Sequence, residues 1–453
     1  MSKVATENKK EVTAKVVVGD DERIIIPRSM TKLEASIQLK KQHEEEETLI
    51  DLIHEFNTWN YKDSLVALMK TMKDVFGWVP GVPTYSFFGV SNPKEINVEV
   101  GFDSKGRSIY EPCFLGEFRI SQWENAKGTA YINNSGDTAI VVTAKKKYAE
   151  RVRKFFTSIQ TTLTKDSIYK GKSIMVNTGI NPHTGSSILD FNFIQNKVSD
   201  KIVLNVDEER VVKNLVIAPL GKEGKRCILL TGDYGTGKTE TAMRIGKEGT
   251  DKGMTFFYCK ESTLFPQLLN KAKLYTPTII FLEDIDEIGS GEERTARMNN
   301  ILNTLDGIQS KGSNLTVIFT TNHVNRINKA LRRPGRIDQI IEFKPCLLDT
   351  RAEIYRRLFR DVSGNETIDY QAIAEKSPEV QGAIIAEIGK RAIDISELSM
   401  DGRISDEAVY TAITSMADHI KFMEEDPEEF RDKRKGIVDD LVSELTDSII
   451  EII

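Results

Sequence analysis

The sequence has no apolar run that approaches the ~18 residues needed to cross a bilayer. Its first residues lead into a polar stretch and lack the apolar core of a signal peptide. Cysteine is scarce, and the four cysteines are scattered without the paired spacing of a disulfide framework or a zinc site. These absences predict a protein of the reducing cytoplasm, neither exported nor held in a membrane.

An excess of positive charge is also missing. Lys and Arg number 62 against 68 Asp and Glu, which gives a net charge of −6. Proteins built around nucleic-acid phosphates usually carry a basic bias. Short basic runs at 145–147 and 431–435 are typical of solvated faces. Nucleic acid is therefore the less favoured partner, although a basic channel inside an oligomer would escape this test.

The chain has 453 residues, 40% of them hydrophobic and 29% charged, which is the mix of a folded protein. The length is about three times the prior for one domain, so several folded units are expected. We expect a flexible charged arm (1–48), an α+β domain (49–166), a linker (167–202), an α/β subdomain (203–345), a helical lid (346–423) and an amphipathic tail (424–453).

The N-terminal part carries no pattern of catalytic or metal-binding residues. In the arm, the apolar segment 24–27 predicts either a strand packed on its own domain or a short plug that docks on a neighbour. Helical spacing is seen at 49–56 and again at 65–76. Further along, β-like segments are expected at 84–88, 96–102, 118–123, 129–133 and 138–143, and a helix at 148–163.

A phosphate-binding pattern, G-x-x-x-x-G-K-[ST], follows the apolar strand 227–230 and opens a helix. Its glycines let backbone N–H groups surround phosphates, and the helix presents its positive end. Lys238 is expected to reach the β- and γ-phosphates, and Thr239 to bind Mg²⁺. The candidate nucleotide-binding residues are Gly232, Asp233, Tyr234, Gly235, Thr236, Gly237, Lys238, Thr239 and Glu240.

Two more apolar strands end in polar residues. The strand 278–282 is followed by Glu283 and Asp284, and the strand 315–319 leads to Asn322. Such acids hold Mg²⁺ and polarise the attacking water in nucleoside triphosphatases, and an amide can bind the γ-phosphate and that water. Because the carboxyl ends of parallel strands meet at one crevice, these residues are predicted to converge.

Arginines occupy a turn at 330–338, among them Arg333 and Arg336. By themselves they are typical of surface salt bridges. Together with the three preceding elements, they suggest fingers that act on the nucleotide of a neighbouring subunit.

Residues 203–423 resemble the module of the AAA ATPases, a clade of the AAA+ superfamily. The segments 303–307, 320–323 and 331–338 carry the resemblance to the second region of homology of that clade. It implies an α/β P-loop fold with a parallel sheet, flanking helices and a helical lid, and it implies ATP and Mg²⁺ as ligands.

The resemblance also implies residue roles. Glu283 would bind the metal, Asp284 would act as general base, and Asn322 would be the first sensor. Arg333 and Arg336 match the finger positions. Gly382 and Ala383 stand where the lid helix touches the nucleotide.

Within the clade, Glu283–Asp286 and Thr321–Val324 look closest to the Bcs-type proteins, which translocate folded cargo in mitochondria. The acid order is Glu then Asp, whereas most of the family has Asp then Glu. Between the strands 256–259 and 278–282 an aromatic-apolar-Gly pore loop is missing, and 264–266 is only a weak substitute. Without a transmembrane segment, the mitochondrial role does not carry over.

The leading interpretation is an ATP-hydrolysing ring, usually a hexamer in this family, that remodels or moves a macromolecular cargo, most simply a protein. A nucleic-acid motor and a nucleotide-gated scaffold with weak hydrolysis stay open as alternatives. The tail 437–453 has an apolar helical face, which predicts a helix that packs on its own lid or docks on a neighbour.

Overall fold

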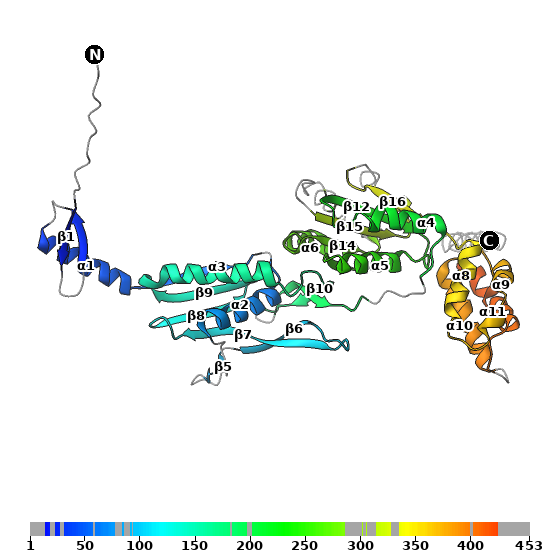
Figure 1. Cartoon of the computed structure of the whole chain (residues 1–453), viewed down its shortest axis with the longest axis horizontal. Helices are drawn as coiled ribbons and strands as arrows, with labels where there is room; N and C mark the ends of the chain where they lie inside the picture. The colour runs from blue at the N-terminus through cyan, green and yellow to red at the C-terminus, as the bar shows by residue number, and fades with distance from the viewer. Residues whose placement is uncertain are drawn as a thin grey trace, which may run out of the picture. The chain divides into compact units, whose positions relative to one another are not determined.

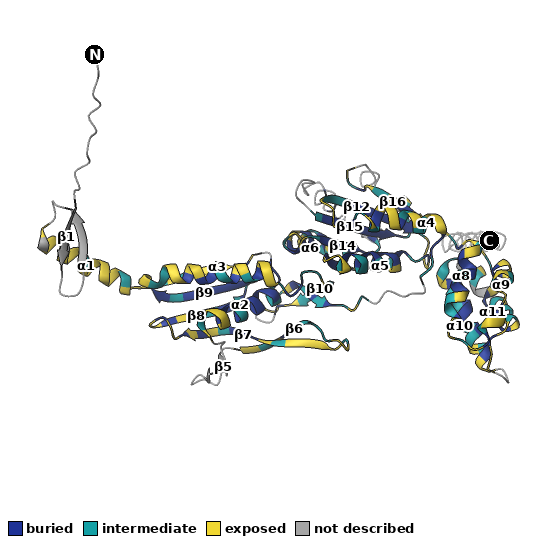
Figure 2. Ribbon diagram, viewed as in Figure 1, coloured by how far each residue is buried: buried dark blue, intermediate teal, exposed yellow. Residues whose placement is uncertain are grey.

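The computed structural model forms two compact units, Met1–Tyr169 with Thr178–Phe191, and Lys170–Asn177 with Asn192–Ile453. It describes residues 14–18, 23–27, 31–57, 59–77, 84–85, 91–92, 94–181, 184–196, 202–285, 301, 305, 314–327, 335–398 and 402–424. Figure 1 shows both units, and Figure 2 shows which of their residues are buried.

The N-terminal unit is built on an antiparallel five-stranded sheet in the order β3-β9-β8-β7-β6. Helices α2 and α3 pack on each other and on β9, so they cover one face of this sheet (Figure 1). Their buried side chains, among them Leu65, Met72 and Phe155, form the core. The strands are β3 (Leu49–Glu55), β6 (Lys94–Phe102), β7 (Ser108–Ile120), β8 (Ala126–Ile132) and β9 (Thr138–Lys145), and the helices are α2 (Tyr61–Phe76) and α3 (Ala149–Asp166).

Local sequence sets the limits of α2. Asn60 caps its start by accepting a hydrogen bond from the backbone N–H of Lys62. Gly77 ends the helix with φ of 73°, a left-handed conformation that glycine adopts without strain. This helix and α3 confirm the two longest helical patterns of the N-terminal part.

The helix that the sequence predicts at 49–56 is wrong, because this segment is strand β3. Apolar residues at 49, 52, 53 and 56 fit a helical period, yet the side chains alternate between exposed and half-buried along the strand. Backbone pairing with β9 decides the outcome, from Leu49 opposite Lys145 to Glu55 opposite Ala139. Tertiary pairing therefore overrides an ambiguous local pattern.

The expected arm 1–48 contains regular structure. Strands β1 (Ala14–Val18) and β2 (Arg23–Pro27) pair antiparallel as a two-stranded sheet. Helix α1 (Lys32–Glu47) follows and begins at a capping box between Thr31 and Glu34. The described side chains of α1 are almost all exposed, as Figure 2 shows. Short strands β4 (Thr84–Tyr85) and β5 (Ser91–Asn92) lie in the expected β-like region.

The second sheet has seven strands in the order β11-β10-β13-β14-β15-β12-β16, with parallel pairing from β10 to β16. The strands β12 to β16 belong to the second unit. The predicted linker 167–202 therefore contains two strands, β10 and β11. The strands are β10 (Ser173–Ile180), β11 (Ser187–Phe193), β12 (Gly224–Gly232), β13 (Thr255–Cys259), β14 (Thr278–Leu282), β15 (Asn314–Thr321) and β16 (Gln339–Phe343), and the helices are α4 (Val206–Val211), α5 (Lys238–Asp251) and α6 (Phe265–Ala272).

A helical lid completes this unit, as the sequence predicts. Its core is formed by buried residues that include Tyr355, Phe359, Ile385 and Ile388. None of the helices in the described ranges is long and apolar enough to cross a membrane. The predicted tail helix at 437–453 lies outside the described residues. The lid helices are α8 (Leu348–Leu358), α9 (Tyr370–Lys376), α10 (Gly382–Glu397) and α11 (Asp406–Glu424).

Asp63 on α2 ties the two helices of the N-terminal unit together. It is 1% exposed, and its carboxylate accepts hydrogen bonds from Ser167 Oγ (2.6 Å) and from the backbone N–H of Ile168 (3.0 Å). Both donors lie just beyond the end of α3. Leaving these two donors without an acceptor lowers the free energy of unfolding.

We predict that Asp63→Ala lowers the free energy of unfolding of the N-terminal unit by about 3 kcal/mol, because it leaves two donors unsatisfied. All three tryptophans, Trp59, Trp78 and Trp123, lie in residues 1–169, so tryptophan fluorescence in urea follows this unit alone. Asp74→Ala, at an exposed position of the same helix, is the matched control. Equal urea midpoints for the two variants would contradict this role for Asp63.

Candidate nucleotide-binding site

The loop between β12 and α5 needs glycine at two positions. At Gly232 an added Cβ would lie 2.3 Å from the carbonyl oxygen of Phe343 on β16, so only glycine allows these strands to pair. Gly237 has φ of 94° where α5 begins, a conformation that residues with a side chain rarely adopt. The loop is therefore shaped by the pattern that the sequence predicts.

Lys238 is only 6% exposed and points its charge into this loop. Its Nζ donates hydrogen bonds to the carbonyl oxygens of Gly232 (2.8 Å) and Asp233 (2.7 Å). The hydroxyl of Thr236 also donates to the oxygen of Asp233 (2.8 Å). A buried ammonium beside the N-terminus of a 14-residue helix favours an anion such as phosphate.

The first acid is joined directly to the loop. Thr239 Oγ1 donates a hydrogen bond to Glu283 Oε1 (2.7 Å), which brings the start of α5 to the end of β14. The hydroxyl of Tyr258, on β13, donates to Glu283 Oε2. Hydroxyl and carboxylate oxygens are the ligands that Mg²⁺ prefers, so Thr239 and Glu283 fit the metal that the resemblance implies.

Tyr258 stays a neutral donor in this arrangement. Burial raises the pKa of its hydroxyl well above the usual value, and the hydrogen bond to Glu283 raises it further. Its ring stacks on Phe281 with 5.0 Å between centroids. The ring and the hydroxyl together fix the Glu283 carboxylate.

The second acid is joined to the neighbouring strand β15. Asn322 Nδ2 donates a hydrogen bond to Asp284 Oδ1 (3.1 Å), and the backbone N–H of Asp284 donates to Thr320 Oγ1 (3.0 Å). Asp284 has φ of 44°, which is uncommon outside glycine. The structure thus brings Lys238, Thr239, Glu283, Asp284 and Asn322 together through the loop, β14 and β15.

The lid touches the phosphate loop through its backbone. The N–H of Ala383, in the first turn of α10, donates to the carbonyl oxygen of Gly235 (3.0 Å). A Cβ on Gly235 would come within 2.8 Å of Ala383 Cβ, and a Cβ added to Gly382 would lie 3.9 Å from the carbonyl oxygen of Gly235. Ala383 therefore contacts the loop, while contact of Gly382 and Ala383 with a nucleotide stays a prediction.

The other candidate residues have simpler surroundings. Asp233, Tyr234 and Glu240 are exposed at the loop and the first turn of α5. Tyr234 approaches the ring of His323 edge-on, with 6.3 Å between centroids. Arg336 is half-buried between Gly335 and β16. Arg333 lies outside the described residues, as do 331–334 and all of 303–307 except Leu305.

Two contacts were missed by the sequence analysis, Tyr258 and Thr320. The sequence signal for the first of them is a tyrosine in the buried run 255–259, since its hydroxyl needs a hydrogen-bond partner.

The segment 264–266, which the sequence analysis named as a weak substitute for a pore loop, fits that role only in part, because Phe265 is fully buried and packs against Phe319 with 5.9 Å between ring centroids. It is therefore not available to contact a cargo.

A parallel sheet, a strand–loop–helix with a buried lysine and two acids at neighbouring strand ends define a P-loop α/β domain. Residues 228–345 match the model of the "ATPase family associated with various cellular activities (AAA)". This part of the chain is therefore similar to an AAA ATPase domain, and the α/β P-loop fold class that the sequence predicts is confirmed.

Several curated proteins are similar to this region. The 26S proteasome regulatory subunit 8 homolog of Schizosaccharomyces pombe is 35% identical over 182 residues, 36% of this chain and 45% of that protein. The homolog of Saccharomyces cerevisiae is 32% identical over 205 residues, 41% of this chain and 49% of that protein. Protein SAV of Sulfolobus acidocaldarius is 30% identical over 204 residues, which are 40% of this chain and 26% of that protein. This chain spans less than half the length of these three relatives.

We predict that Tyr258→Phe raises the Mg²⁺ concentration needed for half of the ATP-dependent rise in melting temperature by about tenfold. The substitution removes one hydrogen bond to a carboxylate, which contributes on the order of 1.5 kcal/mol, while the ring stack on Phe281 is kept. Thermal melting at fixed ATP and varied Mg²⁺ measures the shift. The melting temperature without ligand is the control for folding. An unchanged Mg²⁺ requirement would show that Tyr258 does not position Glu283.

Proposed function

We propose that this protein is a Mg²⁺-dependent ATPase that works as a homo-oligomeric ring and uses ATP hydrolysis to remodel or move a protein cargo. The hydrogen bond from Thr239 to Glu283 is the observation that carries the proposal, because it joins the phosphate loop to the acids of β14. The match of 228–345 to the AAA family and the similarity to proteasome regulatory subunits support it.

The described residues divide the chemistry among themselves. Lys238 and the N–H groups at the start of α5 bind the β- and γ-phosphates. Thr239 and Glu283 hold Mg²⁺, which neutralises charge on the phosphate oxygens when bound. Asp284 accepts the proton of the attacking water. The side-chain amide of Asn322 positions the Asp284 carboxylate by its hydrogen bond to Oδ1 of Asp284.

The lid contact gives a route from the nucleotide to movement. Because the N–H of Ala383 binds the oxygen of Gly235, a change in the loop shifts the start of α10 directly. We assign Gly382 and Ala383 this coupling role. Asp233, Tyr234 and Glu240 line the mouth of the loop, consistent with their exposure.

Ring assembly and the closer family branch are further parts of the proposal. Arg333 and Arg336 act as fingers on the nucleotide of the next subunit, which requires a closed ring, a hexamer by family likeness. The order Glu283 then Asp284 supports a Bcs-type branch. The free, buried thiols of all four cysteines fit the reducing cytosol as the place of action.

Two other functions differ in a measurable way. A nucleotide-gated scaffold is favoured by one observation, the left-handed backbone of Asp284 at the position proposed for the general base. A nucleic-acid motor has only the short basic runs in its favour. A scaffold would turn over ATP slowly or not at all, which separates it from the proposed function. A nucleic-acid motor would hydrolyse ATP faster when nucleic acid is added.

We predict that Lys238→Ala abolishes Mg²⁺-dependent ATP hydrolysis, because it removes the ammonium that binds the phosphates. Release of inorganic phosphate from purified protein measures the rate. Asp284→Asn is the matched variant: it should bind ATP as the wild type does, yet lose about 10²–10⁴ in rate, since an amide accepts no proton. Wild-type turnover in Lys238→Ala would make the site assignment wrong.

We further predict that mixing two inactive variants, Lys238→Ala and Arg336→Ala, restores activity. Loss of a finger costs on the order of 10³–10⁵ in rate. In a mixed ring, an intact nucleotide site of the Arg336→Ala chain meets the intact arginine of the other chain. Arg360→Ala, an exposed arginine of the lid region, is the control and should be active alone. No recovery in rings shown to be mixed would contradict action across subunits.

A further inference from the structure

The outer edge of β3 is open for pairing in the described part of the chain. Two backbone bonds, Phe56 N–H to Thr138 O (2.9 Å) and Lys146 N–H to Thr48 O (2.9 Å), fix which residues face β9. Since backbone direction alternates along a strand, the N–H and C=O groups of 49, 51, 53 and 55 point away from β9. Within the described residues, no strand pairs with this edge.

The side chains of these four residues are all exposed. Leu49 is 53% and Ile53 is 61% exposed, and Asp51 and Glu55 alternate with them. An edge strand of seven residues with exposed apolar side chains is a template for another strand. The alternation adds negative charge to that template.

A pocket of about 310 Å³ opens beside the same strand, on the face that α3 covers. The rings of His54 and Phe156 stack in it with 5.2 Å between centroids. Burial lowers the pKa of His54, so the ring is neutral at pH 7. If a strand were added to β3, every second side chain of that strand would point to the face of the sheet on which this pocket lies. Sheet edges select peptides by this arrangement. The pocket is lined by His54, Arg153, Phe156, Thr157 and Gln160.

The β1–β2 hairpin has the composition that this edge needs. Its strands, Ala14–Val18 and Arg23–Pro27, contain six Val and Ile residues and carry Lys15 and Arg23 without any acid. A two-stranded hairpin is marginally stable in water by itself, and a third strand stabilises it. The acids of the hairpin sequence, Asp20, Asp21 and Glu22, fall between the two strands, so the strands themselves present only Lys15 and Arg23 to Asp51 and Glu55.

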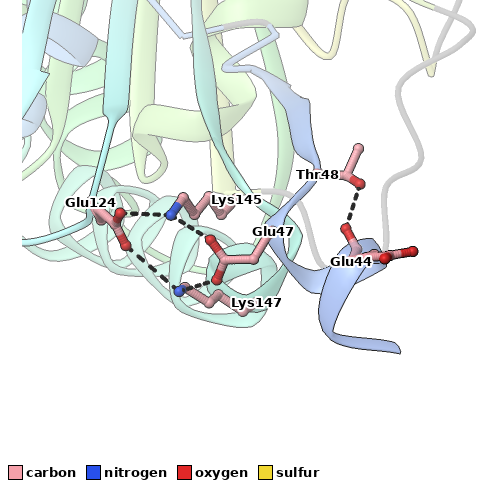
Figure 3. Close-up of polar contacts among 6 residues, drawn as sticks. All are labelled: Glu44, Glu47, Thr48, Glu124, Lys145 and Lys147. Carbon is pink, nitrogen blue, oxygen red and sulfur yellow. Dashed lines mark hydrogen bonds and ion pairs between the residues drawn. The ribbon is translucent and has the colours of Figure 1, made fainter. Parts of the chain in front are cut away.

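Helix α1 keeps the hairpin away from its own β3. Its 16 residues extend about 24 Å, and only Thr48 separates its end from β3. At that end Lys145 binds both Glu47 and Glu124, and Lys147 binds the same two carboxylates (Figure 3). Lys145 and Lys147 hold the pKa of Glu47 at about 2, so the ion pairs persist at neutral pH. The anchored helix separates the hairpin from its own edge strand.

We propose that the β1–β2 hairpin of one copy of this chain adds to the outer edge of β3 in a second copy and places a side chain in the His54 pocket. The N-terminal unit thereby links copies by strand addition. This link goes beyond the proposed ATPase function and does not depend on nucleotide.

Cysteine cross-linking tests the link in the full-length protein without nucleotide and in the Lys238→Ala background, which separates it from the ATPase proposal. Ile25→Cys on one chain and Leu49→Cys on a second chain with a different tag should be joined by a short bismaleimide. The four native cysteines are buried, so they give little background. Ile109→Cys, at an exposed position of β7, replaces Leu49→Cys as the control. A product at Ile109, or none that joins the two tags, would overturn the proposal.

A second variant separates backbone pairing from simple apolar contact. Ile53→Pro, added to the Leu49→Cys chain, removes an outward N–H, and Ile53→Thr loses the apolar side chain but keeps that N–H. The proline variant should lower the cross-linking yield about fivefold more than the threonine variant. Equal yields would overturn strand addition. Tryptophan fluorescence checks folding, and the cysteine result stands alone if the proline variant unfolds.

Discussion

The hydrogen bond between Thr239 and Glu283 depends on the order of the strands, and the rest of the site depends on the same order. Because β12 lies beside β15 and β15 lies beside β14, the carboxyl ends of all three meet at one edge. The loop after β12, the acids after β14 and Asn322 after β15 then come together, although 44 positions separate Thr239 from Glu283 and 38 separate Asp284 from Asn322 along the chain. Parallel pairing is the constraint that builds the site.

Close packing around the loop makes that constraint strict. A Cβ at Gly232 would meet Phe343 O at 2.3 Å, and one at Gly235 would meet Ala383 at 2.8 Å. The first contact fixes the loop to β16, and the second fixes it to the lid. A ligand that reshapes the loop must therefore move one of these partners, and the start of α10, which meets the loop through the N–H of Ala383, offers less resistance than a paired strand.

How far the sequence predicts the structure depends on whether local residues decide it. The strands at 278–282 and 315–319 and the loop at 232–239 were predicted because apolar runs and glycines specify them locally. Strand β3 was misread since its apolar spacing fits two periods and β9 decides between them. Tyr258 was missed because its contact needs the register of β13 against β14, which places Cys259 opposite Leu282. The open edge of β3 in the N-terminal unit could not be predicted for the same reason, since it follows from which strands pair.

The acid order follows from the backbone. Position 284 has φ of 44°, in the left-handed region where Asp is enriched among residues other than glycine, since its short side chain can bond locally. Asn322 and Thr320 hold this conformation from both sides, through the carboxylate and the backbone N–H. A longer Glu at 284 would lose that local advantage. The shorter acid is therefore matched to its backbone, and the hydrogen bonds with Asn322 and Thr320 hold it there.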